Sequence, residues 1–447
     1  MKSLNKLILT GAAVIIGTSC FGQFTLSGQL IPRAEYNHGY KSVADTNQAS
    51  AFSVSQRTRI IASYKMEDFD FFFSAQDVRT WGSTAQLNTT DGFLSVHEAW
   101  AKAKFNEKLG LKLGRQELKY DDDRILGNVD WLMQARSHDA AVLQYNTEKT
   151  KLDVILAFNQ EKYALVGTDY NLANSYRDMQ TVWFNTDLTQ QINMSLLFMN
   201  LGQQVNVINT DGNPHKAINY TQTIGTHTNF KFDKLNFALN GYYQMGSPKV
   251  TPVTPLSAYL VGLEANYKVS DNFSAGIGFE MQSGTSQTDT TVAYSEKAHS
   301  FTPFFGTNHK FNGFMDYFYV GSAHGNVGLQ DAYLKLNYKK EDWTFGLATH
   351  LFLAANDVLD QVELATNGNI KAMNPMLGTE FDLSIGTKIN KSVSVKAGYS
   401  HMLATETLAT LKGVTYTTGP DAGKGRVDQI NNWAYVMVIF KPTFLTK

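Results

Sequence analysis

The sequence predicts an all-β protein whose fold is a transmembrane antiparallel β-barrel of about 18 strands. Three observations support this fold class. Apolar and polar residues alternate along segments that recur to the end of the chain, and the connections between these segments are short and long in turn. The chain is also rich in aromatic residues and glycine, with 28 Phe, 21 Tyr and 34 Gly. Beyond its first residues it contains no apolar run of transmembrane-helix length, so an exported chain of this kind can span a membrane only as a closed barrel.

The first 22 residues have the pattern of a secretory signal peptide. An apolar segment too short to span a bilayer follows two lysines, and Gly22 is a small residue at a suitable cleavage point. The one cysteine, Cys20, lies in this segment. Cleavage before Cys20, as in a lipoprotein, is an alternative, but Gly17 stands where such a site needs a larger aliphatic residue. We therefore expect a signal peptide at 1–22 and a single outer-membrane β-barrel domain at 23–447, without a disulfide bond.

Each predicted strand is an alternating run, and most are roughly 10–13 residues long, the length with which a tilted strand crosses a bilayer. In the run 272–283, Phe273, Ile277 and Phe279 lie on one face, and small or polar residues lie between them. The apolar face fits lipid and the polar face fits a water-filled lumen. The predicted strands are 24–36, 52–64, 68–79, 93–105, 108–116, 138–147, 150–160, 177–187, 191–200, 218–231, 234–245, 257–268, 272–283, 328–338, 342–353, 377–389, 392–404 and 430–441.

The connections fall into two classes that alternate along the chain. Outer-membrane barrels have short periplasmic turns, long outer loops and both termini on the periplasmic side, whereas a soluble sandwich has no reason to sort its loops in this way. The predicted turns lie near 66–67, 106–107, 148–149, 189–190, 233, 271, 339–340 and 391. The predicted loops are 37–51, 80–92, 117–137, 161–176, 201–217, 246–256, 284–327, 354–376 and 405–429.

A barrel of this size encloses an aqueous channel unless loops fill it. The loop 117–137 is expected to line or narrow the pore. The longest loop, 284–327, contains the dispersed histidines His299, His309 and His324, which could bind a transition metal. Its many aromatic residues favour instead a packed loop that folds over or into the pore.

The overall charge excludes some functions. The chain has 39 basic and 40 acidic residues, so no global field attracts nucleic acid.

Hydrolytic chemistry would require a nucleophile oriented by a base, and Ser300 beside His299 is adjacent only in sequence. We therefore expect no catalytic residue, no resident metal and no cofactor.

Several charged residues are predicted to face the lumen. Arg57 and Arg59 share the polar face of their strand, and their guanidinium groups are suited to carboxylate oxygens. The partners could be Glu98 or Asp77 on neighbouring strands, forming a structural ladder, or an anionic solute, and the residues leave both interpretations open. Lys102 lies on the same predicted face as Glu98.

The segment 114–139 carries the densest set of opposed charges in a chain that is only 18% charged. The apolar residues mixed into it indicate a packed loop. The acidic run 121–123 suggests calcium, but it lacks the alternating ligand spacing of an EF-hand, which favours a cross-braced constriction. Strict alternation would place Arg115 towards lipid, at a cost of about 2–4 kcal/mol near the bilayer centre. We expect a bulge at Gly114 to turn Arg115 inward, the alternative being a position above the hydrocarbon.

These residues carry a resemblance to a known family. The chain resembles the alginate-export family of outer-membrane barrels, in the version carried by Bacteroidetes-type bacteria. The motifs are GRQELKYDDDRILGNVDW followed by QARSHDAA, DVRTWG at 77–82, HEAWAKAKF at 97–105 and GTNHKFNGFMDYFYVG at 306–321. The resemblance implies an eighteen-stranded channel with an arginine-rich constriction that conducts a polyuronate outward. The matching basic positions would be Arg57, Arg59, Arg79, Arg115, Arg124 and Arg136, held by Asp122, Asp123 and Asp130. Because this chain is nearly neutral, its anion selectivity would have to come from local placement of charge.

The expected function is therefore a channel in the cell outer membrane that passes an anionic saccharide such as alginate, and not an enzyme. The alternative is a general non-selective porin for small solutes, which the lumen-facing acids Glu264, Glu280, Glu380 and Asp382 favour. A third possibility is a plugged barrel that acts as a membrane-embedded enzyme or an adhesin. The expected partners are the anionic saccharide, outer-membrane lipid and lipopolysaccharide, with no nucleic acid, and the channel is expected to be a monomer.

Overall fold

The computed structural model describes residues 22–90, 92–170, 176–208, 212–248, 254–318 and 325–447. The predicted signal peptide thus lies outside the described residues, apart from Gly22. The strands are β1 (Gln23–His38), β2 (Ala51–Lys65), β3 (Phe69–Thr80), β4 (Leu94–Lys104), β5 (Leu109–Gln116), β6 (His138–Asn146), β7 (Thr150–Phe158), β8 (Asp178–Asp187), β9 (Ile192–Ile208), β10 (Pro214–Phe232), β11 (Leu235–Gly246), β12 (Leu256–Lys268), β13 (Phe273–Gln282), β14 (Leu329–Lys340), β15 (Trp343–Leu353), β16 (Met376–Lys388), β17 (Val393–Ala404), β18 (Asn431–Phe440) and β19 (Thr443–Thr446). The short helices are α2 (Val292–Ser295), η2 (Asn308–Lys310), α3 (Gln361–Asn367) and α4 (Glu406–Leu411).

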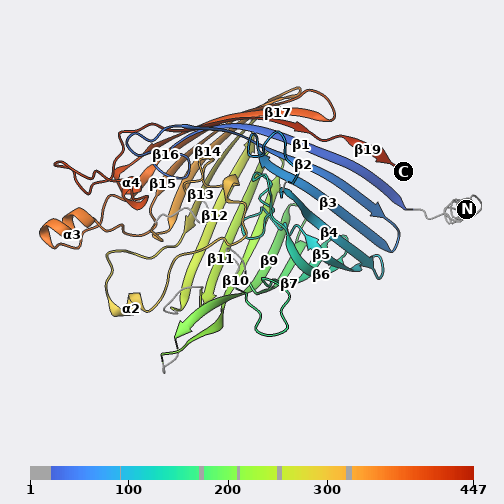
Figure 1. Cartoon of the computed structure of the whole chain (residues 1–447), viewed down its shortest axis with the longest axis horizontal. Coiled ribbons are helices and arrows are strands. Elements are labelled where there is room, and N and C mark those ends of the chain that lie inside the picture. The colour runs from blue at the N-terminus through green and yellow to red at the C-terminus, as the bar shows by residue number, and fades with distance from the viewer. Residues whose placement is uncertain (1–21, 91, 171–175, 209–211, 249–253, 319–324) are drawn as a thin grey trace, which may run out of the picture.

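The strands close into one antiparallel barrel. Each strand from β1 to β17 pairs with the next in sequence, and β18 returns to pair with β1 (Figure 1). The short β19 follows Pro442 and also pairs with β1, so β18 and β19 together occupy one strand position in the wall. Within the described residues the wall is therefore the predicted eighteen-stranded barrel. No helix in this part of the chain is long and apolar enough to cross a membrane.

The connections are sorted between the two ends of the barrel as predicted. The short turns lie at the end that holds both termini, and α2, α3 and α4 lie on long loops at the other end (Figure 1). The predicted loop 201–217 is wrong for most of its length, because β9 continues to Ile208 and β10 begins at Pro214. These two strands have 17 and 19 residues, and their hairpin projects past the rest of the barrel (Figure 1).

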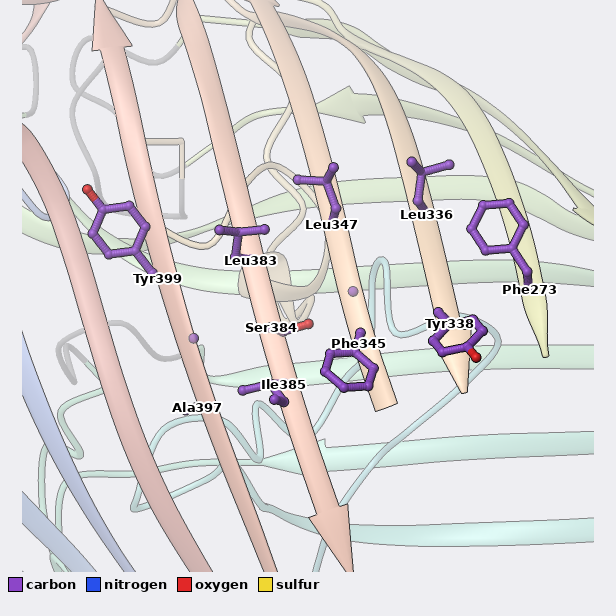
Figure 2. Close-up of a pocket in the computed structure, with 12 residues that line it drawn as sticks. Phe273, Leu336, Tyr338, Phe345, Leu347, Leu383, Ser384, Ile385, Ala397 and Tyr399 are labelled. Carbon is purple, nitrogen blue, oxygen red and sulfur yellow. The ribbon is translucent and has the colours of Figure 1, made fainter. Parts of the chain in front are cut away.

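The outer face of the wall is apolar. In cross-strand register, Phe273 lies opposite Tyr338, Tyr338 opposite Phe345, and Phe345 opposite Ile385. Figure 2 shows this row with a second row above it that includes Leu383, and together they line a shallow groove of about 540 Å³. Such side chains remain exposed on the isolated chain because their solvent in the membrane is lipid.

The inside of the barrel is not an open tube. Two clusters of buried hydrophobic residues lie between the wall and long loops, one of them including Met133, Met315 and Trp433, the other Leu126 and Phe305. The loops 117–137 and 284–327 supply much of this filling, together with residues of other long loops such as Val358 and Leu408. The path that a solute can take through the lumen therefore depends on how these two loops are held.

Candidate constriction of the channel

The loop 117–137 crosses the interior from one wall to the other. Near its start, Tyr120 donates a hydrogen bond to Asp153 on β7 at 2.8 Å. Arg124 forms an ion pair with Glu280 on β13. Further along, Asp130 lies 2.9 Å from a guanidinium nitrogen of Arg57 on β2. The loop is thus fixed to strands on distant parts of the wall, as expected of a constriction rather than of a mobile outer loop.

Arginines on β1 and β2 hold one end of this loop. Arg57 is 1% exposed, and besides its ion pair it donates to the carbonyl oxygens of Asp130 at 3.4 Å and Met133 at 3.3 Å. Arg33 donates to the carbonyl oxygen of Trp131 at 2.7 Å, and its guanidinium carbon lies 4.3 Å from the centre of the Trp131 ring. Arg59 donates to Gln76 at 2.8 Å and lies 3.9 Å from the Asp130 carboxylate. Arg57 and Arg59 therefore brace the loop, and within the described residues neither forms an ion pair with Glu98 or Asp77, the wall partners that the sequence had left open beside an anionic solute.

The acidic run at the other end is a tight turn whose side chains diverge. Asp121 and Asp123 have φ values of 55° and 72°, a left-handed conformation that aspartate tolerates better than most residues. Asp121 accepts a hydrogen bond from Trp183 at 2.9 Å, and Asp122 accepts one from Asn240 at 2.9 Å. The Asp123 carboxylate instead pairs with Lys310 at 3.1 Å. Because the three carboxylates face different partners, they do not converge on one cation.

The two remaining loop arginines also act as braces. Arg124 is buried, and its guanidinium lies 3.6 Å from the centre of the Phe311 ring as well as beside Glu280. Arg136 donates to the carbonyl oxygens of Gly127 and Gly306, at 3.4 Å each. Each arginine thus joins the loop 117–137 to the loop 284–327 or to the wall beyond it.

The two loops pair directly with each other. Leu126 and Phe305 form a parallel bridge, in which the Gly127 amide donates to the Phe305 carbonyl at 2.9 Å and the Phe305 amide donates to the Ile125 carbonyl at 3.2 Å. The Val129 amide also donates to the hydroxyl of Thr307 at 3.2 Å. This bridge is a small element of sheet that lies inside the barrel and is not part of the barrel wall.

Buried carboxylates on β16 hold the second loop. The Met315 amide donates to Glu380 at 2.7 Å, and the Phe314 amide donates to Asp382 at 3.3 Å. Glu380 and Asp382 are 0% and 1% exposed, so these backbone donors are needed to compensate for their burial. Gly313 has a φ of 78°, and a β-carbon there would lie 2.6 Å from a Glu380 oxygen. Glycine is therefore required for the loop to approach the carboxylate this closely.

An aromatic cluster joins the loops to the seam between β1 and β18. The ring of Trp131 stacks on His309 with centroids 4.3 Å apart, and its edge packs on Trp433 and Tyr435. His309 also lies 2.8 Å from Asp316. This histidine is thus held by stacking and one carboxylate.

The other two histidines of the loop 284–327 are not near His309 in any described contact. His299 stacks on Tyr294 at 4.4 Å, and His324 lies outside the described residues. The structure therefore brings no pair of them together in the described part of the chain.

Two predicted pore residues are on the wrong face. Arg115 pairs in unbroken register with Ala99 and Asp139, and its side chain lies 3.1 Å from the Asp139 carboxylate on the outer face. The expected bulge at Gly114 is absent, so alternation holds and the exposed ion pair compensates the charge at the strand end. Arg79 is also on the outer face, where it donates to Asp77 at 2.6 Å.

Lys102 has the predicted lumen parity but lies away from the loops. It faces Lys112 across β4 and β5, and it lines a cavity formed by residues of the short turns 66–68 and 105–108. It is therefore near the end of the barrel that holds the termini, and not at the constriction.

A cavity of about 490 Å³ lies against the two loops on the lumen side. One part of its surface is apolar or aromatic. The other part carries four basic side chains and one carboxylate, namely Arg57, Lys310, Lys396, Lys441 and Asp130. Lys396 and Lys441 are exposed, and neither forms an ion pair in the described part of the chain.

Sequence reasoning missed several residues that organise this region. Asp331 and His350 are buried on the inner wall, and the His350 ring lies 3.0 Å from the Asp331 carboxylate. Alternation along β14 and β15 contains the signal for both, because each lies on the polar face. The contribution of Gly313 had no comparable signal, since it depends on a carboxylate 67 residues away in the chain.

Comparisons with known proteins agree with this architecture. The sequence matches the family described as Alginate export over residues 24–418. Pseudomonas aeruginosa OpdQ is similar in structure, with 12% identity, a TM-score of 0.56, and coverage of 94% of this chain and 98% of that chain. Pseudomonas aeruginosa OpdO has 11% identity, a TM-score of 0.58, and coverage of 94% and 98%. Pseudomonas aeruginosa OpdK, whose crystal structure was determined with vanillate, has 8% identity, a TM-score of 0.56, and coverage of 94% and 99%. No functionally curated protein matches the sequence.

At these identities the structural similarity establishes the fold alone, which is that of an outer-membrane porin barrel. The family match covers most of the chain, so the protein belongs to the Alginate export family. It is an outer-membrane channel rather than an enzyme, which confirms the fold class, the location and the general function expected from the sequence.

Proposed function

We propose that this channel passes an anionic saccharide, with a uronate oligomer or polymer such as alginate as the substrate class. The supporting observation is the cavity beside the two loops, whose lining includes Arg57, Lys310, Lys396 and Lys441 but one carboxylate, Asp130. Separate cations around a wide space attract an anion at several weak sites, which lets it enter and leave. The overall charge of the chain does not prevent this, because selectivity follows the local field.

The other surface of the cavity fits the sugar part of such a solute. Trp131, Phe314 and Tyr435 line it together with aliphatic side chains. Apolar and aromatic surface can pack against the C–H faces of a pyranose ring while the basic groups meet its carboxylate. A uronate presents both features in one residue, whereas an inorganic anion presents only the charge.

Single-channel recording of the pure protein in a planar bilayer tests the proposal. We expect the reversal potential in a salt gradient to show anion preference, and the double variant Lys396→Gln with Lys441→Gln to reduce it. Arg79→Gln is the matched control, because Arg79 is an arginine on the outer face. A cation preference, or an anion preference that the double variant leaves unchanged, would contradict the proposal.

A general porin is the second candidate. The lumen acids that favoured it are largely engaged: Glu280, Glu380 and Asp382 are buried under the loops, and Glu264 pairs with Lys335 at 3.2 Å. Liposome swelling with neutral and acidic oligosaccharides of equal length separates the candidates. Faster entry of the acidic sugar supports the anion channel, and equal rates support a general porin.

The remaining partners belong to the same proposal. The closed barrel completes its own wall, which favours a monomer, and its apolar outer face would contact lipid, with lipopolysaccharide around the outer rim. Mass measurement in native detergent micelles would check the oligomeric state.

A further inference from the structure

A β-bulge on β4 brings two ligand-type side chains to the lumen side of the wall. Ser74 on β3 pairs with Glu98, but the next residue, Ala75, pairs with Val96, so His97 is an additional residue in β4. His97 is 3% exposed, and Glu98 accepts hydrogen bonds from the Trp100 indole and the Glu117 amide, so both point inward although they are consecutive. Bulges are frequent beside functional sites because they redirect a side chain in this way.

The first residue of the loop 117–137 completes a cluster with these two. The His97 Nε2 atom lies 2.9 Å from one oxygen of Glu117, and the other Glu117 oxygen accepts a hydrogen bond from Asn128 at 2.8 Å. One ligand atom from each of His97, Glu98 and Glu117 lies within 4.8 Å of the others. One imidazole nitrogen and two carboxylate oxygens form a ligand set that suits a divalent transition metal such as Zn²⁺.

The cluster is accessible from the lumen. A cavity of about 340 Å³ is lined by Glu98 and Glu117, together with Lys112 and Gln116. Water in this cavity can complete the coordination of an ion held by three protein ligands. The Asn128 hydrogen bond would orient the Glu117 carboxylate, which is the arrangement that supports ligands in established metal sites.

We propose that His97, Glu98 and Glu117 form a binding site for a divalent transition-metal ion taken up from the lumen. The same ion would fix the root of the loop 117–137 to β4, because Glu117 is the first residue after β5 and its partner Asn128 lies within that loop. The positive charges of Arg59 and Lys112 near the two carboxylates oppose the ion and weaken its binding. The site is independent of the solute that the channel carries.

Titration calorimetry with ZnCl₂ on the full-length, tag-free protein in detergent tests the proposal. We expect one site per chain, with affinity reduced at least roughly tenfold in His97→Gln and in Glu117→Gln. His401→Gln is the control, because His401 lies on β17 beside Tyr399 and away from the cluster. Heat-modifiable migration on gels shows whether each variant has folded.

A second measurement does not depend on the variants. Crystals of the unaltered protein soaked in ZnCl₂ should give an anomalous peak beside the His97 Nε2 atom, and saturating Zn²⁺ should reduce current fluctuations in single-channel recordings. Binding that both variants retain, or an anomalous peak only at other positions, would overturn the site. Unchanged fluctuations at saturation would overturn the link to the loop.

Discussion

Replacing Arg57 by alanine should loosen the constriction without opening the barrel. Arg57 is 1% exposed, and it joins β2 to the loop 117–137 through the Asp130 carboxylate at 2.9 Å and two carbonyl oxygens at 3.3 and 3.4 Å. The two carbonyl contacts are long and therefore weak. Asp130 keeps a side chain 47% exposed, so solvent screens the ion pair and hydrates the carboxylate that remains in the variant.

These contacts set the size of the effect. Hydrogen bonds to a charged group contribute about 1.5–3 kcal/mol, and the screening and long distances favour a total of about 2–3 kcal/mol for docking of the loop. At 1.4 kcal/mol for each factor of ten, the undocked population should rise roughly 30- to 150-fold. The neighbouring anchor, Arg33 to the Trp131 carbonyl, remains in the variant and keeps the loop mostly docked.

Single-channel recording measures this population as the frequency of current fluctuations. Arg57→Ala should fluctuate more often than the unaltered channel, and Arg57→Lys should lie between them, because lysine keeps the charge but not the planar fork. Arg79→Ala is the matched control on the next strand, where the side chain is on the outer face. A folded Arg57→Ala channel with unaltered fluctuations would show that the arginine does not hold the loop.

Three further predictions concern other contacts. Gly313→Ala should displace the segment at Met315, because a β-carbon there would lie 2.6 Å from a Glu380 oxygen and the left-handed backbone adds a strain of about 1–2 kcal/mol. Hydrogen exchange of the Met315 amide should therefore accelerate. Gly368→Ala is the control, because Gly368 has a φ of 72° with open space around it and should show the strain alone. Asp130→Asn should increase anion preference in reversal-potential measurements, because it removes the one carboxylate from the cavity that holds Arg57; an unchanged preference would argue against a role of this cavity in selectivity. Burial lowers the pKa of Lys412 to about 8, so amine labelling followed by mass spectrometry should find its midpoint near that pH and well below that of the exposed Lys424. Since the pKa of Lys412 in the folded protein lies below its ordinary value of 10.5, the folded outer loop should gain stability as pH rises from about 8 towards 10.5. Equal labelling midpoints for Lys412 and Lys424 would refute this.

The wall was predictable because its physical rule is local. A strand between lipid and water must alternate, and this requirement is visible over ten residues without knowledge of the neighbours. The same rule places Arg115 on the outer face, where the structure has it. The expected bulge at Gly114, which would have turned Arg115 inward, was wrong. The bulge on β4, at His97, does shift the alternation by one residue, because the outward residues are Leu94 and Val96 before it and Ala99 and Ala101 after it.

The interior was predictable only in outline. A charged segment with apolar residues indicated a packed, cross-braced loop, and the loop 117–137 is packed and cross-braced. Its partners could not be predicted from the sequence, because Leu126 meets Phe305 and Asp123 meets Lys310 across about two fifths of the chain. Alternation shows that Arg57 faces the lumen, but it does not show whether a carboxylate on the wall or one on a loop lies within reach of its guanidinium group.

The small sheet element between Leu126 and Phe305 has a consequence for how the two loops can move. The Gly127 amide donates to the Phe305 carbonyl and the Phe305 amide donates to the Ile125 carbonyl, so neither loop can leave the other without breaking backbone hydrogen bonds. The two loops are therefore mechanically coupled, and a change that detaches one of them from the wall also pulls on the other.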